Sequence, residues 1–350
     1  MPHKIIDLRS DTVTRPTPAM YAAMQTAVLG DDVLGDDPTV IELEVESAKI
    51  MGKEAGLFVP SGSMGNQICL AVQTNPGESA IFEDEAHMIY YEAGAPGVIA
   101  QIICRTVVGK DGVMDPEKLE AKITAGSLHT PRTSIVCVEN THNRAGGAVI
   151  PMDYLRAYRA LTLKHGIKLH MDGARVFNAS AQLGIDVKEI ADTCDTMSFC
   201  LSKALGAPVG SVIVGSSEFI EKARLWRKRL GGGMRQSGLL AACGLVGLRS
   251  MRDRLHEDHS RAKTLAKQLN ELPGLVVDLE KRSTNFVMVE TEKPASEWIE
   301  KLAEQNVLAM AFNPHLLRLI THYDVDDAEI VQTVNVFSSL AYSSLQSSTN

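Results

Sequence analysis

Short apolar runs alternate with longer amphipathic ones along the chain as far as Val214. This alternation is typical of parallel strands joined by crossover helices. Several of the short runs are apolar at almost every position, as expected for strands that are covered on both faces. The predicted strands are residues 56–59, 79–82, 101–107, 134–138, 168–171, 196–200 and 211–214. The pattern therefore predicts an α/β fold with a mostly parallel seven-stranded sheet.

Helix signals separate several of these runs. Asp37 is a suitable N-cap for a helix over residues 39–51, with Pro38 in its first turn and Gly52 as its stop. A second helix is expected over residues 152–165, with Gly166 as its stop. From Gln236 the helical spacing of apolar residues continues almost to Leu272, where Pro and Gly follow. We expect this long helix to link two domains.

A smaller α+β unit is expected after the long helix. The predicted strands there are residues 275–279, 285–289 and 316–320, and the predicted helices are 295–305 and 328–340. We therefore predict a large α/β domain over residues 1–250, with an N-terminal segment that contributes to the active site. The small domain is predicted over residues 251–342. The polar residues 343–350 are expected to be disordered.

Composition narrows the class of protein. With 350 residues, 45% of them hydrophobic, the chain can bury a sizeable core. Its net charge is −8, and its basic residues form no stripe along the sequence, so nucleic acid is not an expected partner. No segment approaches the ~20 apolar residues of a membrane helix, and the N-terminus does not look like a signal peptide. We expect a cytoplasmic protein whose six scattered cysteines are buried, reduced thiols.

Two predicted strand ends carry the chemistry expected of a pyridoxal phosphate (PLP) site. Lys203 lies where a strand opens into a loop, and ligands of open α/β sheets bind at such ends. Alone, it would more often be a solvated surface charge. Asp172 and Arg175 follow another strand; the alternative is that they only cap the next helix. PLP needs a Schiff-base lysine, a carboxylate facing its pyridine nitrogen and a donor to its phenolate oxygen. Together the three residues predict PLP.

Two further segments agree with a PLP site. The turn that contains Gly62 and Ser63 precedes a helical pattern, and it can present backbone N–H groups and a hydroxyl to a phosphate. It lacks the lysine of a Walker loop and the spacing of a dinucleotide fingerprint, so a single phosphate monoester is the better ligand. His87 follows another strand end and could stack on a cofactor ring and relay protons. The alternative for His87 is a loop histidine without a role.

With these segments assembled, the chain resembles the L-threonine aldolases, a family of fold-type I PLP enzymes. The resemblance runs over nearly the whole length. Its specific parts are residues 8–14, 61–66, 139–143, 171–175, 200–203, 231–236 and 318–322. Two positions depart from the family pattern: Ala204 stands where Gly is more common, and Gly65 where Ala is more common. A methyl group beside the Schiff base could alter the pocket or the loop.

The resemblance implies a role for each candidate residue. In the cofactor site, Lys203 forms the Schiff base, Asp172 holds the pyridine nitrogen, Arg175 lies beside the ring oxygen, His87 stacks on the ring, Gly62 and Ser63 hold the phosphate, and Lys228 and Arg235 reach it from a neighbouring subunit. For the substrate, Ser10 and Arg318 would bind its carboxylate together with Arg175, and His129 would be a second active-site histidine. Thr12, Thr14 and Ser198 match positions that hold a cation in some relatives.

The resemblance also implies a reaction and an assembly. The expected reaction is reversible retro-aldol cleavage of L-threonine, L-allo-threonine and other β-hydroxy-α-amino acids to glycine and an aldehyde. His87, His129 or a water that they hold could be the base. The shared site implies a homo-oligomer, with a tetramer favoured. The alternatives are a racemase of a small amino acid such as alanine, a β-eliminating lyase, a catalytically silent scaffold of this fold and, least favoured, an NAD-dependent enzyme. The preference for the L-threo or L-allo isomer stays open.

Overall fold

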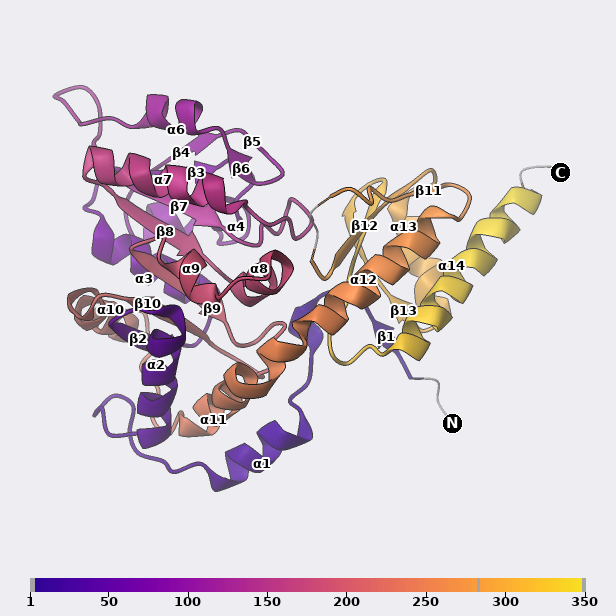
Figure 1. Ribbon diagram of the computed structural model, residues 1–350, viewed down its shortest axis with the longest axis horizontal. Coiled ribbons are helices and arrows are strands. Elements are labelled where there is room, and N and C mark those ends of the chain that lie inside the picture. Colours follow the sequence, from indigo (N-terminus) through magenta and orange to yellow (C-terminus); the bar gives the residue numbers. More distant parts are fainter. Residues whose placement is uncertain (1–3, 282–283, 348–350) are drawn as a thin grey trace.

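The computed structural model describes residues 4–281 and 284–347 and places them in two domains joined by a helical segment (Figure 1). The large domain contains a seven-stranded sheet of order β2-β10-β9-β8-β7-β3-β4. Its strands are β2 (Ala55–Val59), β3 (Ser79–Glu83), β4 (Ile103–Val107), β7 (Thr133–Glu139), β8 (Lys168–Asp172), β9 (Thr196–Cys200) and β10 (Ser211–Gly215). Only β10 runs antiparallel to its neighbours in this sheet. The predicted α/β class and mostly parallel seven-stranded sheet are confirmed.

Helices cover both faces of this sheet. They are α1 (Pro18–Thr26), α2 (Pro38–Met51), α3 (Gly62–Gln73), α4 (His87–Tyr90), α5 (Ala95–Val98), α6 (Pro116–Lys122), α7 (Met152–His165), α8 (Val176–Leu183), α9 (Val187–Ala191) and α10 (Ser217–Arg229). Phe58 of β2 packs in the cluster that contains residues of α2 and α7, whereas Leu57 and Val59 pack with α3 and α10. Adjacent residues of a strand point to opposite faces, so β2 is buried on both sides.

Local capping explains why two of the predicted helices have their observed bounds. The Asp37 carboxylate accepts hydrogen bonds from the Thr39 and Val40 amides at the start of α2. Gly52 ends this helix with a φ of 64°, which glycine adopts at little cost. Gly166 ends α7 in the same way, with a φ of 60°. Both helices were predicted from these residues, and both predictions are confirmed.

The linker between the domains is helical but not one continuous α-helix. It consists of α11 (Gly238–Val246), a π turn (Gly247–Met251), a 3-10 turn (Arg252–Arg254) and α12 (Leu255–Asn270). At the start of the π turn the backbone lies against the loop that follows Lys203, since a Cβ at Gly247 would lie 3.0 Å from the Leu205 carbonyl oxygen. The expected single helix was therefore wrong in its middle, at a close backbone contact that the apolar spacing does not encode.

The small domain is built around α12 and a four-stranded antiparallel sheet (Figure 1). Its remaining elements are β11 (Leu275–Val276), β12 (Phe286–Thr291), α13 (Ala295–Glu304), β13 (Val307–Leu308), β14 (Met310–Asn313), β15 (Leu316–Ile320) and α14 (Asp327–Ser347). Helix α14 includes residues 343–347, for which we expected disorder, and residues 348–350 of that segment lie outside the described residues. Strand β14 was not predicted.

The N-terminal segment packs with the small domain. Strand β1 (Ile6–Asp7) pairs in parallel with β13, and Ile6 and Leu8 are buried in the small-domain core. The 3-10 turn Asp11–Val13 follows and leads toward Lys203, where the Thr14 hydroxyl donates a hydrogen bond to the Lys203 carbonyl oxygen. By packing, this segment therefore belongs to the small domain, whereas the predicted domain boundary assigned it to the large one.

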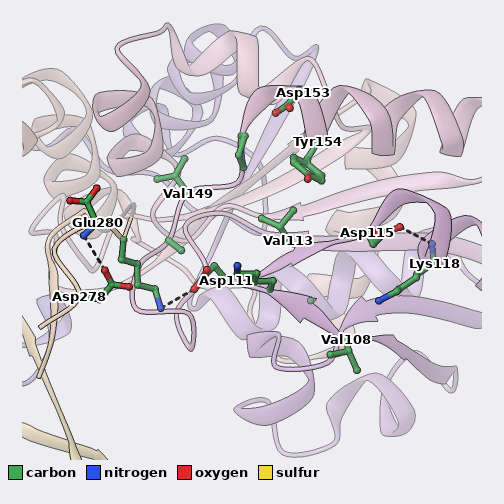
Figure 2. Close-up of a pocket in the computed structure, with 15 residues that line it drawn as sticks. Val108, Asp111, Val113, Asp115, Lys118, Val149, Asp153, Tyr154, Asp278 and Glu280 are labelled. Atoms are coloured by element: carbon green, nitrogen blue, oxygen red, sulfur yellow. Dashed lines mark hydrogen bonds and ion pairs between the residues drawn. The ribbon is translucent and has the colours of Figure 1, made fainter. Parts of the chain in front are cut away.

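A broad hollow of about 850 Å³ lies between the β5–β6 hairpin (Gly109–Lys110 and Val113–Met114) and the small domain (Figure 2). An ion pair of 3.0 Å joins Lys281 and Asp111 across it. Its lining carries charges of both signs, and none of the predicted site residues lines it. In the described ranges, no helix has both the length and the apolar character needed to cross a bilayer.

Replacing Tyr158 with Phe should destabilise the large domain. The Tyr158 hydroxyl donates a hydrogen bond of 2.7 Å to the Met114 carbonyl oxygen, and the side chain is fully buried. Its removal leaves a buried acceptor without a partner, so we expect a loss of about 1–3 kcal/mol in the free energy of unfolding, measured in urea. Tyr342→Phe, at an exposed tyrosine, is the matched control and should change it little. Equal values for the two variants would contradict this account.

Candidate active site

Residues from four strand ends meet at the carboxyl edge of the large sheet. Lys203 follows β9, Asp172 ends β8, His87 follows β3, and Gly62 follows β2. Two adjoining cavities of about 420 and 290 Å³ lie there and share Thr12, His87, Asp172, Ala174 and Lys203 in their linings. The larger cavity also contains Ser10, Arg175 and Arg318, and the smaller contains Gly62 and Ser63. One chain thus brings together most of the predicted site residues.

Asp172 is a buried carboxylate held by two hydrogen bonds. Its Oδ2 accepts a hydrogen bond of 2.8 Å from Asn66 Nδ2, and its Oδ1 accepts one of 3.1 Å from the Ala174 amide. Burial by itself raises the pKa of Asp172, but the charges of His87 and Lys203 and the Asn66 hydrogen bond outweigh it and lower the pKa. The group is therefore kept ionised, as a partner of a protonated pyridine nitrogen must be.

Asn66 has only one possible orientation. Its Nδ2 lies 2.8 Å from both Asp172 and Glu92, and carboxylates can only accept. Its Oδ1 must then accept from the Ser198 hydroxyl at 2.6 Å and from His170 Nε2 at 3.3 Å. Burial lowers the pKa of His170 to about 4, so its ring is neutral. Asn66, which also lines the smaller cavity, thus fixes the orientation of the Asp172 carboxylate.

His87 is oriented by Glu92. Its Nδ1 donates a hydrogen bond of 3.0 Å to Glu92 Oε1, which leaves Nε2 as the nitrogen free to act in the cavity. Burial lowers the pKa of His87, but the hydrogen bond to Glu92 and the charges of Asp172 and Glu139 raise it above its ordinary value. The ring also lies 5.4 Å from that of Tyr91, another residue of the cavity wall.

Arg175 forms a buried, bidentate ion pair with Asp11. Arg175 Nε donates to Asp11 Oδ2 at 2.7 Å, and Nη2 donates to Oδ1 at 2.6 Å. Burial alone would raise the pKa of Asp11, but the guanidinium outweighs it and lowers the pKa. The pair fixes the Arg175 side chain in the cavity wall and leaves Nη1 available to a ligand. It also attaches the N-terminal segment to the large domain.

The smaller cavity ends at the N-terminus of α3. The Ser61 hydroxyl caps this helix by accepting from the Met64 amide. Among the described residues, neither the Gly62 and Ser63 amides nor the Ser63 hydroxyl has a hydrogen-bond partner. Helix N-termini with free amides bind phosphate. Gly65 faces the sheet and not this end of the cavity, because a Cβ at Gly65 would lie 2.9 Å from Cγ2 of Ile213 in β10.

Arg318 projects from β15 into the larger cavity without a carboxylate partner in the described part of the chain. It donates to Asn143 Oδ1 at 3.3 Å and to the Arg9 carbonyl oxygen at 3.2 Å, while its Nε is buried and unpartnered. Burial, with the nearby Arg175 charge, lowers the pKa of Arg318. A buried cation without a counter-ion is costly, so an anionic ligand would stabilise it.

Some candidate residues are not brought to the cavities. His129 lies in an exposed turn and lines neither cavity, so its role stays a prediction. Lys228 and Arg235 also lie outside both linings, and Arg235 pairs with Asp31 at 2.9 Å. The predicted cation ligands have separate partners: Thr12 donates to Ser10, Thr14 to the Asp11 and Lys203 carbonyl oxygens, and Ser198 to Asn66. Cation binding therefore stays a prediction as well.

The sequence reasoning missed several residues of the site. Asp11, Asn66 and Asn143 lie inside motifs that resemble the aldolase family, but they received no role. Glu92 lies outside those motifs, and its spacing of five residues from His87 is neither of the helical contact spacings, i,i+3 and i,i+4, so nothing in the sequence signals this contact. Ala204 is buried in the core and lines neither cavity, so its methyl group does not narrow the site.

These residues match the polar groups of PLP. Lys203 and the ionised Asp172 line both cavities, the free amides of α3 lie at one end, and the unpaired Arg318 lies at the other. Together they would serve a carbonyl group, a protonated pyridine, a phosphate and the carboxylate of an amino acid. This set of groups defines a PLP-dependent enzyme of amino-acid chemistry.

Comparison with known proteins confirms the class and gives the family. The chain matches the beta-eliminating lyase family over residues 7–293 and belongs to it. It is 43% identical over 348 residues to the probable low-specificity L-threonine aldolase 2 of Arabidopsis thaliana, covering 97% of this chain and 98% of that one. It is 42% identical over 330 residues to the low-specificity L-threonine aldolase of Escherichia coli K12, covering 94% and 97%.

Solved structures agree on the fold. The threonine aldolase of Leishmania major superposes with a TM-score of 0.81 at 20% identity and covers 96% of this chain and 99% of that one. A serine palmitoyltransferase (SPT) structure described with a PLP internal aldimine has a TM-score of 0.75 at 18% identity, covering 97% and 88%. The chain therefore has the fold of fold-type I PLP enzymes, as predicted.

Replacing Glu92 with Gln should lower the pKa of His87, because the variant removes the charge that favours the imidazolium. A raised pKa means that the charged form of His87 stabilises the fold. This contribution is complete below the ordinary value of 6.5 and is lost as pH rises through the raised pKa. In Glu92→Gln this loss should occur at lower pH. Titration of ¹³C-labelled histidine by NMR measures the shift, and an unchanged pKa would show that Glu92 does not control His87.

Proposed function

We propose that this enzyme cleaves L-threonine, L-allo-threonine and similar β-hydroxy-α-amino acids to glycine and an aldehyde. The observation that carries the proposal is the buried, unpaired guanidinium of Arg318 in the same cavity as Lys203 and His87. It supplies a site for a substrate α-carboxylate beside the lysine that would carry the cofactor. The identity of 42–43% to low-specificity L-threonine aldolases over nearly the whole chain supports the same reaction.

Each residue performs a separate task in this proposal. Lys203 would hold PLP covalently and release it to the substrate amine, and PLP would supply the electron sink for cleavage of the Cα–Cβ bond. Asp172 keeps the pyridine nitrogen protonated, and Arg175 donates to the ring oxygen. Gly62 and Ser63 bind the phosphate through their free amides and hydroxyl. Arg318 and Ser10 orient the substrate carboxylate, which selects the bond that breaks.

His87 is the group best placed in this chain to take the proton of the β-hydroxyl. Glu92 holds its Nδ1, so Nε2 is the nitrogen that can accept a proton directly or through a water. With a raised pKa, His87 needs a pH above that value to be neutral and act as the base. His129 is the second candidate for this base. It lines neither cavity, so it would have to act from outside both.

The proposal includes a cytoplasmic homotetramer. Helices α1 and α2 both pack against α11, and these two helices and the loop between them expose large apolar side chains: Tyr21, Val28, Leu29, Leu34, Ile41 and Val45. A second copy of this chain would bury this face, since exposed apolar patches of this kind mark interfaces. Lys228 and Arg235 would then reach the phosphate of the neighbouring site. Five of the six cysteines are buried, as expected, whereas Cys104 in the edge strand β4 is exposed; all six are free, which suits a reducing compartment.

Lys203→Ala should abolish both cofactor attachment and catalysis. We expect loss of the visible absorbance of bound PLP and a fall in acetaldehyde formation from L-threonine by about three orders of magnitude or more, because the covalent route is removed. A coupled assay for acetaldehyde, with chromatography for glycine, measures turnover. Formation of D-amino acid from L-alanine by the wild-type enzyme, without acetaldehyde from L-threonine, would instead identify a racemase.

Mixing two inactive variants tests the shared site. A Lys203→Ala subunit lacks the Schiff-base lysine, and an Arg235→Ala subunit lacks the proposed donor to its neighbour's phosphate. A mixed pair contains one complete site, so co-refolded or co-expressed subunits should regain about a quarter of wild-type activity on statistical grounds. Assays of the mixture measure this, and purified, differently tagged hybrids should reach about half of wild-type activity, since one of their two sites is complete. Hybrids no more active than either parent would contradict a site built from two chains.

A further inference from the structure

Glu139 is a buried carboxylate that the proposed reaction does not use. It ends β7, is 4% exposed and lines the larger cavity. Its Oε2 accepts a hydrogen bond of 2.7 Å from the His87 amide, and its Oε1 accepts one of 2.8 Å from the Asn143 amide. Both oxygens of one side chain are therefore bound to backbone groups of two segments that are far apart in the sequence.

Each of these segments carries a functional group of the site. His87 belongs to the large domain, and its ring lines both cavities. Asn143 Oδ1 accepts from Arg318 Nη1 at 3.3 Å, and Arg318 comes from the small domain. The path His87–Glu139–Asn143–Arg318 thus connects the group that faces the cofactor with the group that binds the substrate carboxylate.

The loop that contains Asn143 also contacts the small domain beyond Arg318. The Thr284 hydroxyl donates to the Gly147 carbonyl oxygen at 3.2 Å, and a Cβ at Gly147 would lie 2.6 Å from the Phe286 ring. His142 does not compete for Glu139. Its Nε2 lies 2.8 Å from Glu83 and 3.8 Å from Glu139, and its Nδ1 accepts from the Ala145 amide. Both Glu139 oxygens therefore remain available to the two amides.

We propose that Glu139 is a positioning residue that keeps His87 and Arg318 at a fixed separation, and so sets the affinity for both PLP and the amino acid. This inference rests on the proposed function, because it assigns Arg318 to the substrate carboxylate. A carboxylate suits the task since both of its oxygens accept from N–H donors. A glutamine offers one oxygen and turns its NH₂ group toward the second amide.

The test uses three variants of the full-length enzyme. Glu139→Ala removes both hydrogen bonds, and Glu139→Gln keeps one in nearly the same volume. Asn143→Ala keeps the Asn143 amide and removes only the side-chain oxygen that accepts from Arg318 Nη1. PLP affinity is measured by equilibrium dialysis, and binding of glycine and of L-threonine is measured by the change in visible absorbance of the loaded enzyme. Glu120→Gln, at a partly exposed carboxylate that pairs with Lys164 on α7, is the control.

The three variants are expected to differ in which binding affinity they lower. Glu139→Ala should weaken both PLP and amino-acid binding by about tenfold each, since each lost bond is charge-assisted. Glu139→Gln should give smaller losses, and Asn143→Ala should weaken amino-acid binding alone. In the double variant Glu139→Gln/Asn143→Ala, the loss of amino-acid affinity should be less than the product of the single losses, because both act through Arg318.

Several outcomes would overturn the proposal. One is that the Glu139 variants keep their affinities for PLP and for the amino acid within twofold of the control. Another is that the losses of amino-acid affinity multiply in the double variant. A third is that the variants change in thermal stability alone. If Glu139→Ala does not fold, the proposal is tested with the nearly isosteric Glu139→Gln. Failure of the aldolase assignment is separate, because the wild-type enzyme would then form no acetaldehyde while glycine binding would still report on Arg318.

Discussion

The site is organised around the negative charge of one buried carboxylate, that of Asp172. Asp172 is 4% exposed, and a second carboxylate, Glu92, lies with it and His87 in one cluster. Two buried carboxylates at this separation repel each other unless donors stand between them. Asn66 donates one N–H to each, and His87 Nδ1 donates a hydrogen bond to Glu92. The orientation of His87 and the ionisation of Asp172 therefore follow from the same balance of charge.

The architecture was largely predictable because it depends on patterns that are local in sequence. Short apolar runs revealed every strand of the large sheet, including the largely exposed edge strand β4, and Asp37, Gly52 and Gly166 marked helix ends through their own conformational preferences. What failed depends on distant contacts. The π turn at Gly247 lies where the linker meets the Leu205 carbonyl, and β1 exists only because β13 pairs with it. Neither contact leaves a periodic signal.

The reactive groups of the site could be predicted from the sequence, but the residues that orient them could not. Lys203, Asp172 and His87 follow strand ends, and the carboxyl ends of parallel strands share an edge, so their meeting could be inferred. The partners that orient them come from elsewhere in the chain: Asp11 for Arg175, Glu92 for His87, and Asn143 for Arg318. Such pairings depend on side-chain geometry across elements. Sequence spacing therefore suggests which groups react but not which groups hold them.

The pairing of β1 with β13 has a consequence for synthesis on the ribosome. The first residues of the chain find their strand partner at Val307 and Leu308, about 300 residues later, and Ile6 and Leu8 have their core neighbours in the small domain. The large sheet, with the Arg175 that pairs with Asp11, can be complete once Gly215 has emerged, yet β1 still lacks its partner β13. The N-terminus is thus translated first but placed last, so an unfinished chain can fold its sheet before it has a working active site.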